Sequence, residues 1–338
     1  MRDLPVPRLH FGGLPTDLQP LPRLSQALGG PRLWVKRDDL TDLGGGNKVR
    51  PLEFLLADAL KRRAPHLVTF AGGAQSNHLR ATAMAARRLG LQPILVIFDD
   101  SPTSRAQGNQ LLNLVLGARV LYLGWLGKPD PRRSIEQSIR LMSLLATVYP
   151  GLAGPHRYVI PVGGFHPLGA LGYVAAASEM AEQAAQQGVR LDYVVTAAGT
   201  GTTAAGLVAG FQWLGLPTKV VAVDGGRRWH DFPRSILRLA EATLRRVGRP
   251  GRIPAEALEF HAEFVGPGYA IPTVQGLNAV QVAARTEGLI LEPVYTSKAM
   301  AGLMSLVQRG RFSREDTVVF LHTGGLPALY AYNEHFSR

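Results

Sequence analysis

Short runs of β-branched and aromatic residues recur along the chain, and most are separated by stretches long enough for a helix. The runs are residues 67–70, 94–98, 120–123, 158–161, 193–196, 220–224 and 318–321. Two of the intervening stretches, 52–60 and 79–89, are rich in Leu and Ala and have a helical pattern. Strands that alternate with helices predict an α/β fold with parallel sheets and crossover helices. In such sheets ligands lie at the carboxyl ends of the strands, so the loops after the strands are the candidate sites.

Composition narrows the chemistry that these loops can perform. Of the 338 residues, 46% are hydrophobic and 18% are charged, as in an ordinary folded protein of one large or two fused domains. The chain has no cysteine, which excludes disulfides, thiolate zinc sites, iron–sulfur clusters and a cysteine nucleophile. We predict no metal site.

The formal net charge is +12, and the densest basic segment, 227–252, holds eight Arg against Asp231 and Glu241. We interpret this segment as an exposed helix. A basic nucleic-acid-binding protein is the alternative from a different class of function. It lacks a recognisable binding motif and interleaved aromatic residues, so we expect no nucleic-acid partner.

One uncharged segment, 194–218, is long enough to span a bilayer. Its glycines and threonines indicate a strand, a glycine loop and a helix instead. No apolar run follows Met1, so no signal peptide is predicted. We therefore expect a cytoplasmic protein without membrane contact.

The segment 42–50 places three glycines and Asn47 directly before Lys48. A phosphate-binding Walker loop requires Ser or Thr after the Lys, and Val49 stands there instead. A Lys that is held at a helix start beside a cation or an apolar wall loses its proton easily and can form a Schiff base. A flexible turn with a solvated Lys explains this motif equally well when it is taken alone.

Two further loops follow predicted strands. In segment 71–78, Ser76 and Asn77 are suitable caps for the next helix, and together with His78 they could also face a ligand. In segment 196–206, glycines and threonines alternate at a helix start without forming the dinucleotide pattern. Hydroxyl groups, backbone N–H groups and the positive end of the helix dipole there favour a single phosphate.

The last two motifs are residues 292–298, which place Tyr295 after a Pro and before a helix, and residues 322–327, which follow the last strand. A phosphate site, a Schiff-base Lys and an aromatic ring that can stack together fit pyridoxal 5′-phosphate. The motifs resemble those of the fold type II pyridoxal-phosphate enzymes, in the branch of 1-aminocyclopropane-1-carboxylate (ACC) deaminase and D-cysteine desulfhydrase. The match extends in order from residues 36–40 to residues 322–325.

The resemblance implies two open, mostly parallel twisted sheets flanked by helices, with the cofactor between two domains. It places residues 1–50 and 163–338 in a large cofactor-binding domain and residues 51–162 in a small domain, in a homodimer. The implied catalytic residues are Lys48, Ser76, Tyr269 and Tyr295. The implied cofactor-binding residues are Lys48, Asn77, Gly199, Thr200, Gly201, Thr202, Thr203, Tyr295, Thr296 and Thr323. The implied substrate-binding residues are Ser76, Asn77, His78 and Tyr269.

Two departures from the deaminase pattern decide which reaction we predict, and a third departure, from the family at large, concerns the contact with the phosphate. Thr296 stands where the deaminases have Glu, Thr323 where they have Leu, and Pro51 where the family usually has a phosphate-contacting Lys. A neutral Thr holds a proton on the pyridine nitrogen less firmly than a carboxylate does. We therefore expect β-elimination from D-cysteine, with pyruvate, hydrogen sulfide and ammonia as products. Elimination from L-cysteate or another β-substituted alanine is the close alternative. ACC deamination is a less favoured alternative. Lys48 and Tyr295 are both present, which argues against a non-catalytic homologue that only binds the cofactor.

Overall fold

The computed structural model describes residues 4–98, 106–124, 130–149 and 156–336. The strands are β1 (Leu18–Pro20), β2 (Arg32–Lys36), β3 (His66–Ala71), β4 (Gln92–Ile97), β5 (Arg119–Tyr122), β6 (Arg157–Ile160), β7 (Tyr193–Ala198), β8 (Lys219–Asp224), β9 (Leu258–His261) and β10 (Thr317–Leu321). The α-helices are α1 (Pro22–Leu28), α2 (Val49–Lys61), α3 (Asn77–Arg88), α4 (Gly108–Val115), α5 (Ile135–Val148), α6 (Pro167–Gln186), α7 (Thr202–Leu214), α8 (Phe232–Arg246), α9 (Val274–Glu287), α10 (Thr296–Gln308) and α11 (Leu326–Leu329).

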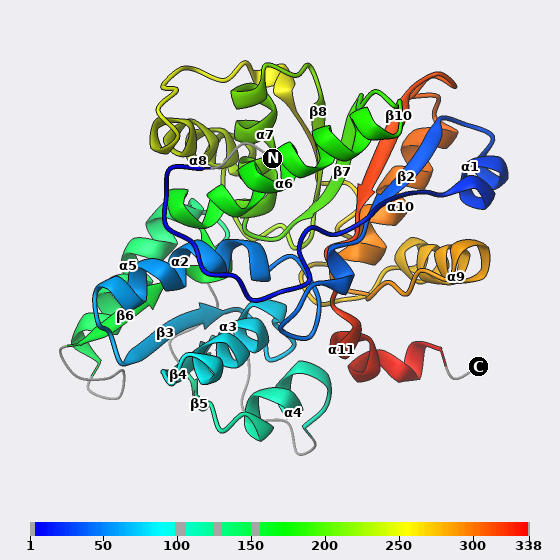
Figure 1. Cartoon of the computed structure of the whole chain (residues 1–338). Coiled ribbons are helices and arrows are strands. Elements are labelled where there is room, and N and C mark those ends of the chain that lie inside the picture. The colour runs from blue at the N-terminus through cyan, green and yellow to red at the C-terminus, as the bar shows by residue number, and fades with distance from the viewer. Residues whose placement is uncertain (1–3, 99–105, 125–129, 150–155, 337–338) are drawn as a thin grey trace.

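The strands form two sheets (Figure 1). The larger has the order β1-β2-β10-β7-β8-β9, in which every pair is parallel except β1 with β2. The smaller has the order β5-β4-β3-β6 and is parallel throughout. The predicted fold class, with two mostly parallel sheets flanked by helices, is confirmed. The smaller sheet uses chain between residues 66 and 160, which lies inside the predicted small domain; the exact boundaries at residues 50 and 162 stay a prediction.

Each of the seven predicted strands is present, and the segment 194–218 forms β7, a glycine loop and α7 as predicted. In the described residues no helix is long and apolar enough to cross a membrane. The segment 227–252 contains α8, which buries Phe232, Ile236 and Leu239 on one face and carries Arg on the other. The prediction of a helix in this basic segment is thus confirmed.

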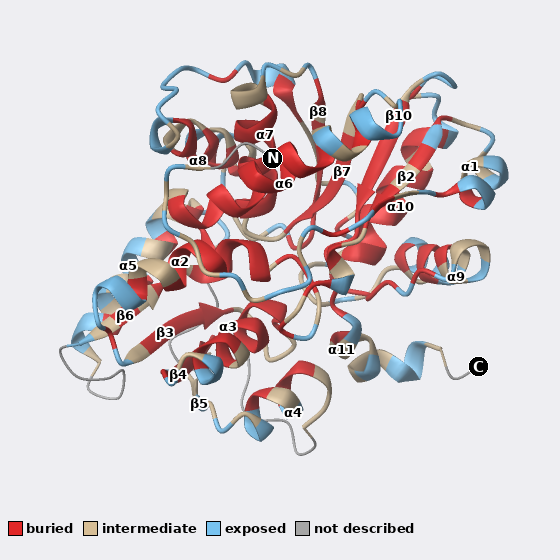
Figure 2. Ribbon diagram, viewed as in Figure 1, coloured by how far each residue is buried: buried red, intermediate tan, exposed pale blue. Residues whose placement is uncertain are grey.

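Close packing on α6 brings the starts of two other helices together. Most residues of α6 and α7 are buried (Figure 2). A Cβ on Gly172 of α6 would lie 2.4 Å from the carbonyl carbon of Arg50 in α2, and a Cβ on Gly206 of α7 would lie 2.3 Å from the carbonyl oxygen of Ala170. Such distances are too short for any side chain, so glycine permits these helices to touch. As a result, the N-termini of α2 and α7 lie near each other.

A buried ion network lies behind the start of α2. Arg50 donates through Nε and Nη2 to the two carboxylate oxygens of Asp38, at 2.8 and 2.7 Å, and through Nη1 to Glu179 at 3.0 Å. Lys36 also pairs with Glu179, and the Tyr173 hydroxyl donates to Asp38 at 2.6 Å. Burial alone would raise the pKa of Asp38, but Arg50, the Tyr173 hydroxyl and Lys36 together outweigh it and hold that pKa below its usual value. The network joins β2, α2 and α6 at a single point.

Candidate active site

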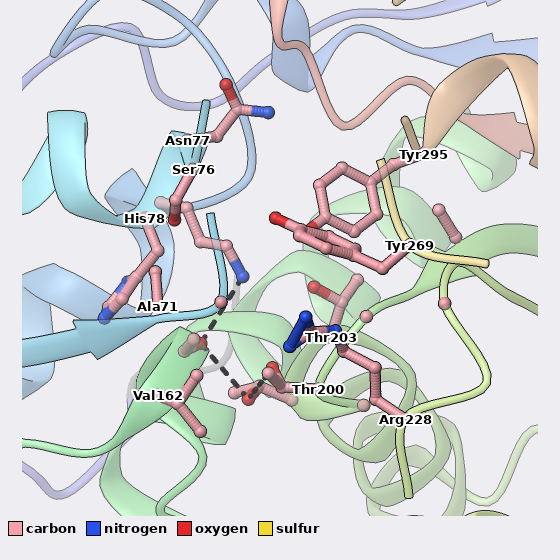
Figure 3. A pocket seen from close by; sticks show the side chains of 18 of the residues that line it. Ala71, Ser76, Asn77, His78, Val162, Thr200, Thr203, Arg228, Tyr269 and Tyr295 are labelled. Atoms are coloured by element: carbon pink, nitrogen blue, oxygen red, sulfur yellow. Dashed lines mark hydrogen bonds between the residues drawn. The ribbon is translucent and has the colours of Figure 1, made fainter. Parts of the chain in front are cut away.

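A single cavity contains most of the residues that the sequence analysis singled out (Figure 3). It lies at the carboxyl ends of strands from both sheets, as expected for parallel α/β structures. Its wall from the smaller sheet carries Ala71, Gly72, Ser76, Asn77 and His78. Its other described lining residues include Asn47, Lys48, Gly163, Gly199, Thr200, Gly201, Thr202, Thr203, Gly226, Arg228, Trp229, Tyr269, Tyr295 and Thr323. No acidic residue is among the described lining residues.

Lys48 lies at the start of α2, where only Asn47 separates it from the glycine loop 44–46. All three glycines have positive φ, and a Cβ on Gly46 would lie 2.8 Å from the carbonyl oxygen of Thr323. The loop therefore packs tightly against the end of β10 and directs Lys48 into the cavity. The Lys48 Nζ atom lies 3.4 Å from the carbonyl oxygen of Gly163. Burial lowers the pKa of Lys48 to about 8, which makes its neutral, nucleophilic amine accessible near physiological pH.

The N-terminus of α7 forms a cradle for an anion. Gly201, with φ of 82°, precedes the helix, and the Thr202 hydroxyl donates to the carbonyl oxygen of Gly163 at 3.3 Å. A Cβ on Gly163 would lie 2.2 Å from Thr200 Oγ1, so the two loops can approach only because glycine stands there. The Asn47 amide donates to Thr203 Oγ1 at 2.9 Å and joins the cradle to the start of α2. Backbone N–H groups at the start of a 13-residue helix, with threonine hydroxyls, fit a phosphate dianion.

The opposite wall is the start of α3. The Ser76 hydroxyl accepts a hydrogen bond from the Leu79 N–H at 3.3 Å, so Ser76 caps the helix as well as lining the cavity. The side-chain oxygen of Asn77 accepts from Asn109 Nδ2 at 2.7 Å. This contact fixes the orientation of the Asn77 amide, so that its Nδ2 group remains the donor.

His78 contributes differently from its neighbours, because its ring is hydrogen-bonded to Thr69 of β3. The Thr69 hydroxyl donates to the carbonyl oxygen of Ile160 at 2.9 Å, so it accepts from His78 Nε2, also at 2.9 Å. Nε2 therefore carries the proton, and burial lowers the pKa of His78 to about 3. A neutral ring with its only N–H bound to Thr69 has none to offer a carboxylate. A substrate carboxylate at this wall is therefore better matched by the Ser76 hydroxyl and the first backbone N–H groups of α3.

The two predicted active-site tyrosines lie together. The Tyr295 hydroxyl donates to the Tyr269 hydroxyl at 3.1 Å, and the ring centroids are 5.8 Å apart. Tyr295 is the N-cap residue of α10 and lies against Gly199 and Gly225, where a Cβ would come within 2.8 Å of its ring atoms. Burial raises the pKa of Tyr295, so the phenol keeps its proton. This ring is positioned by both the phosphate cradle and the loop after β8.

The two threonines that distinguish this chain from the deaminase pattern occupy different positions. Thr323 lines the cavity, whereas Thr296 does not. The Thr296 hydroxyl accepts from the Glu292 N–H at 2.8 Å, and the Glu292 carboxylate accepts from the backbone N–H groups of Val294, Tyr295 and Thr296. Glu292 is thus occupied with holding the start of α10. Of the two threonines, Thr323 is therefore the one that can face a ligand in the cavity.

Several lining or supporting residues were missed by the sequence analysis. Trp229 donates from its indole nitrogen to the carbonyl oxygen of Gly199 at 2.8 Å and fixes the phosphate cradle. Asn109 orients Asn77 from α4, a helix with no motif of its own. Arg228 lies within the basic segment, where its neighbours gave no signal that it faces a cavity. Pro51 packs against Gly164 and supplies no cation, so Lys48 and Arg228 are the cations among the described lining residues.

A reactive lysine, a phosphate cradle and a stacked tyrosine at the ends of two parallel sheets define a pyridoxal-phosphate site of fold type II. A family model for pyridoxal-phosphate dependent enzymes matches residues 9–324, and the chain belongs to that family. A solved crystal structure described as an ACC deaminase homologue matches with a TM-score of 0.85 and 33% sequence identity. The match covers 98% of this chain and 96% of that one. Pyridoxal 5′-phosphate is therefore the cofactor of this enzyme.

Proposed function

We propose that this enzyme is a β-elimination lyase that converts D-cysteine and water to pyruvate, hydrogen sulfide and ammonia. Bound pyridoxal phosphate supplies an electron sink that stabilises negative charge at the Cα of an amino acid. Lys48 would hold the cofactor covalently and then take the Cα proton on Nζ. The lowered pKa of Lys48 suits both roles, because a base works best when its pKa lies near the working pH.

The absence of a carboxylate from the described lining residues carries this proposal. An acidic group beside the ring nitrogen would keep that nitrogen protonated and favour the opening of the ACC ring. Here Thr323 is the group at the end of β10, and the Glu292 carboxylate is held by three backbone N–H groups of α10. A neutral partner leaves more electron density at Cα for expulsion of a β-substituent.

ACC deamination is the second candidate, because the similar solved structure is described as an ACC deaminase homologue. L-cysteate and other β-substituted alanines are further candidates within elimination. We also propose a homodimer, a cytoplasmic location and no nucleic-acid partner, on the resemblance and the sequence.

Measuring the release of pyruvate and 2-oxobutyrate from a panel of substrates separates these candidates. The substrates are D-cysteine, L-cysteine, D- and L-cysteate, β-chloro-D-alanine and ACC, each with sulfide or ammonia measured in parallel. We expect pyruvate and sulfide from D-cysteine and little 2-oxobutyrate from ACC. Faster turnover of ACC than of every β-substituted alanine would overturn the elimination proposal.

A further inference from the structure

Tyr269 is carried by a loop at the surface of the molecule. The loop, residues 262–273, connects β9 to α9, and two residues away from Tyr269 on either side, Pro267 and Ile271 are exposed. Ala270, directly after the tyrosine, has φ of 60°. This value lies in the left-handed region, which a residue with a side chain adopts at a cost and keeps where its surroundings hold it. The position of Tyr269 therefore depends on contacts made to this loop from outside.

Two side chains from other elements bind the carbonyl groups on either side of Tyr269. Lys298 of α10 donates from Nζ to the carbonyl oxygen of Gly268 at 2.7 Å. The hydroxyl of Tyr332, in the segment that follows α11, donates to the carbonyl oxygen of Ala270 at 2.9 Å. Burial raises the pKa of Tyr332, so this phenol keeps the proton that it donates. The backbone is thus held one residue before and one residue after Tyr269.

Lys298 also links this loop to the backbone against which Tyr295 packs. Its side chain is fully buried, and Nζ donates a second hydrogen bond to the carbonyl oxygen of Gly225 at 3.3 Å. A Cβ on Gly225 would lie 2.8 Å from a ring atom of Tyr295, so the Gly225 backbone lies directly against that ring. Tyr295 is itself the N-cap of the helix that carries Lys298. One ammonium group therefore ties the loop of Tyr269 to the loop that supports Tyr295.

The tyrosine pair tolerates little displacement. The Tyr295 hydroxyl donates to the Tyr269 hydroxyl at 3.1 Å, and both side chains line the cavity (Figure 3). Hydrogen bonds between hydroxyls are usually about 2.5–3.0 Å long, so an outward shift of about 0.5 Å would break this one. Lys298 and Tyr332 are not among the described lining residues of the cavity, so neither is placed to touch a ligand there.

We propose that Lys298 and Tyr332 are positioning residues, which clamp the backbone on both sides of Tyr269 and keep its hydroxyl against that of Tyr295. This inference rests on the cofactor site and not on β-elimination, so it holds for any amino acid that the enzyme converts. Removing either side of the clamp should move Tyr269 while the phosphate cradle and Lys48 stay in place. Turnover should therefore fall while the affinity for the cofactor is kept.

The first experiment compares Tyr332→Phe with Tyr330→Phe, since Tyr330 is exposed and lies in the same segment. With the substrate of the panel that reacts fastest, Tyr332→Phe should lower kcat by about tenfold, the effect of one lost hydrogen bond. Lys298→Met loses two hydrogen bonds from a charged group and should lower kcat by about 30-fold. Tyr330→Phe and Lys61→Met, at an exposed lysine, should match the wild type. The dissociation constant of pyridoxal phosphate should change by less than about threefold in all four variants.

A double-mutant cycle separates positioning from a general loss of structure. Tyr269→Ala removes the side chain that the clamp positions, so Tyr332→Phe added to it should lower kcat by less than about twofold. Lys298→Met added to Tyr269→Ala should cost less than it does alone, and a remainder is expected because its bond to Gly225 supports Tyr295. Tyr332→Phe removes only a hydroxyl, so the cycle stands even where Lys298→Met fails to fold.

Hydrogen exchange of the holoenzyme measures the loop without turnover. Peptides covering residues 266–273 should exchange about fivefold faster in Tyr332→Phe and in Lys298→Met than in the wild type, because each variant loses a bond that holds the loop closed. Peptides from α7, at the phosphate cradle, should exchange at the wild-type rate.

Four outcomes would overturn the proposal. Unchanged kcat in Tyr332→Phe, or unchanged exchange of residues 266–273 in both variants, would show that the clamp does not hold Tyr269. An equal loss of kcat with and without the Tyr269 side chain would make the two residues structural supports of another part of the enzyme. A loss of cofactor affinity as large as the loss of kcat would place their effect on the cofactor instead. If no substrate of the panel reacts, the exchange measurement decides alone.

Discussion

Lys48 and Arg50 are two residues apart at the start of α2, and their surroundings are opposite. Arg50 lies in the buried ion network, where the carboxylates of Asp38 and Glu179 accept hydrogen bonds from its guanidinium. Lys48 points into a cavity where no described lining residue is acidic, and its Nζ reaches a carbonyl oxygen at 3.4 Å. Both cations are withdrawn from water, but only one is neutralised. A paired buried charge fixes structure, whereas an unpaired one becomes a base and a nucleophile.

The largest expected effect comes from removing the unpaired cation. Lys48→Met should lower the rate of pyruvate release by about 10³-fold or more, because it removes both the covalent attachment and the base. Steady-state assays at saturating cofactor measure this. Lys61→Met, at the exposed end of the same helix, is the matched control and should retain wild-type rates. A Lys48→Met enzyme with more than a tenth of the wild-type rate would contradict the assignment.

Removing the paired cation should act on stability instead. Arg50→Met leaves Asp38 and Glu179 buried with one fewer partner, and breaking such a pair typically costs about 3–5 kcal/mol of the free energy of unfolding. Urea denaturation checks this value. Arg62→Met breaks an exposed pair with Asp58 and should cost about 1 kcal/mol or less. Equal losses in the two variants would mean that the buried network does not hold the start of α2.

The pH at which Lys48 becomes reactive sharpens the comparison. A lysine is nucleophilic only when neutral, and its neutral fraction increases as pH rises through its pKa. Because burial lowers that pKa to about 8, capture of pyridoxal phosphate by cofactor-free enzyme should accelerate with a midpoint near pH 8. An exposed lysine would give a midpoint near 10.4. Stopped-flow absorbance in Lys48→Met provides the baseline, and a wild-type midpoint above pH 10 would show that the amine is not perturbed.

The smallest effect on the enzyme is expected from a residue that does not line the cavity but orients a residue that does. Asn109→Ala releases the Asn77 amide, together with the Arg80 and Gln75 contacts of the same side chain. It should weaken cofactor binding by about tenfold, the effect of losing the one hydrogen bond that orients Asn77. Fluorescence titration of cofactor-free enzyme measures it. Asn113→Ala is the control on the same helix, because the Asn113 side-chain oxygen has no hydrogen-bond partner among the described residues. Equal weakening in both variants would point to damage to α4 rather than to orientation of Asn77.

The sequence was most informative where local pattern and burial coincide. The central strands are short apolar runs, and the loops after β3 and β7 contain motifs whose residues do meet in one cavity. Strands β1 and β9 were missed because they are short edge strands, and β2 because charged residues stand at both of its ends. In β2, Lys36 resembles a loop residue by sequence but is buried against Glu179, 143 positions away.

Local sequence pattern also fails to show which of the candidate residues reach the site. Thr296 and Thr323 are equivalent as departures from a sequence pattern. In the structure, Thr323 lines the cavity, whereas the Thr296 hydroxyl is bonded to the Glu292 N–H at the start of α10. Asn109 orients Asn77 from a helix without a recognisable motif, so its role depends on tertiary contacts that no spacing along the chain encodes.

The identity of the lysine that binds the cofactor tests the central claim most directly. Lys298 is the internal rival, since burial lowers its pKa to about 8 as well. Its ammonium, however, donates to the carbonyl oxygens of Gly268 and Gly225, at 2.7 and 3.3 Å, outside the set of lining residues. Borohydride reduction of the holoenzyme followed by peptide mass mapping should place the cofactor on Lys48 alone. An adduct on Lys298 or Lys36, with Lys48 unmodified, would contradict the account.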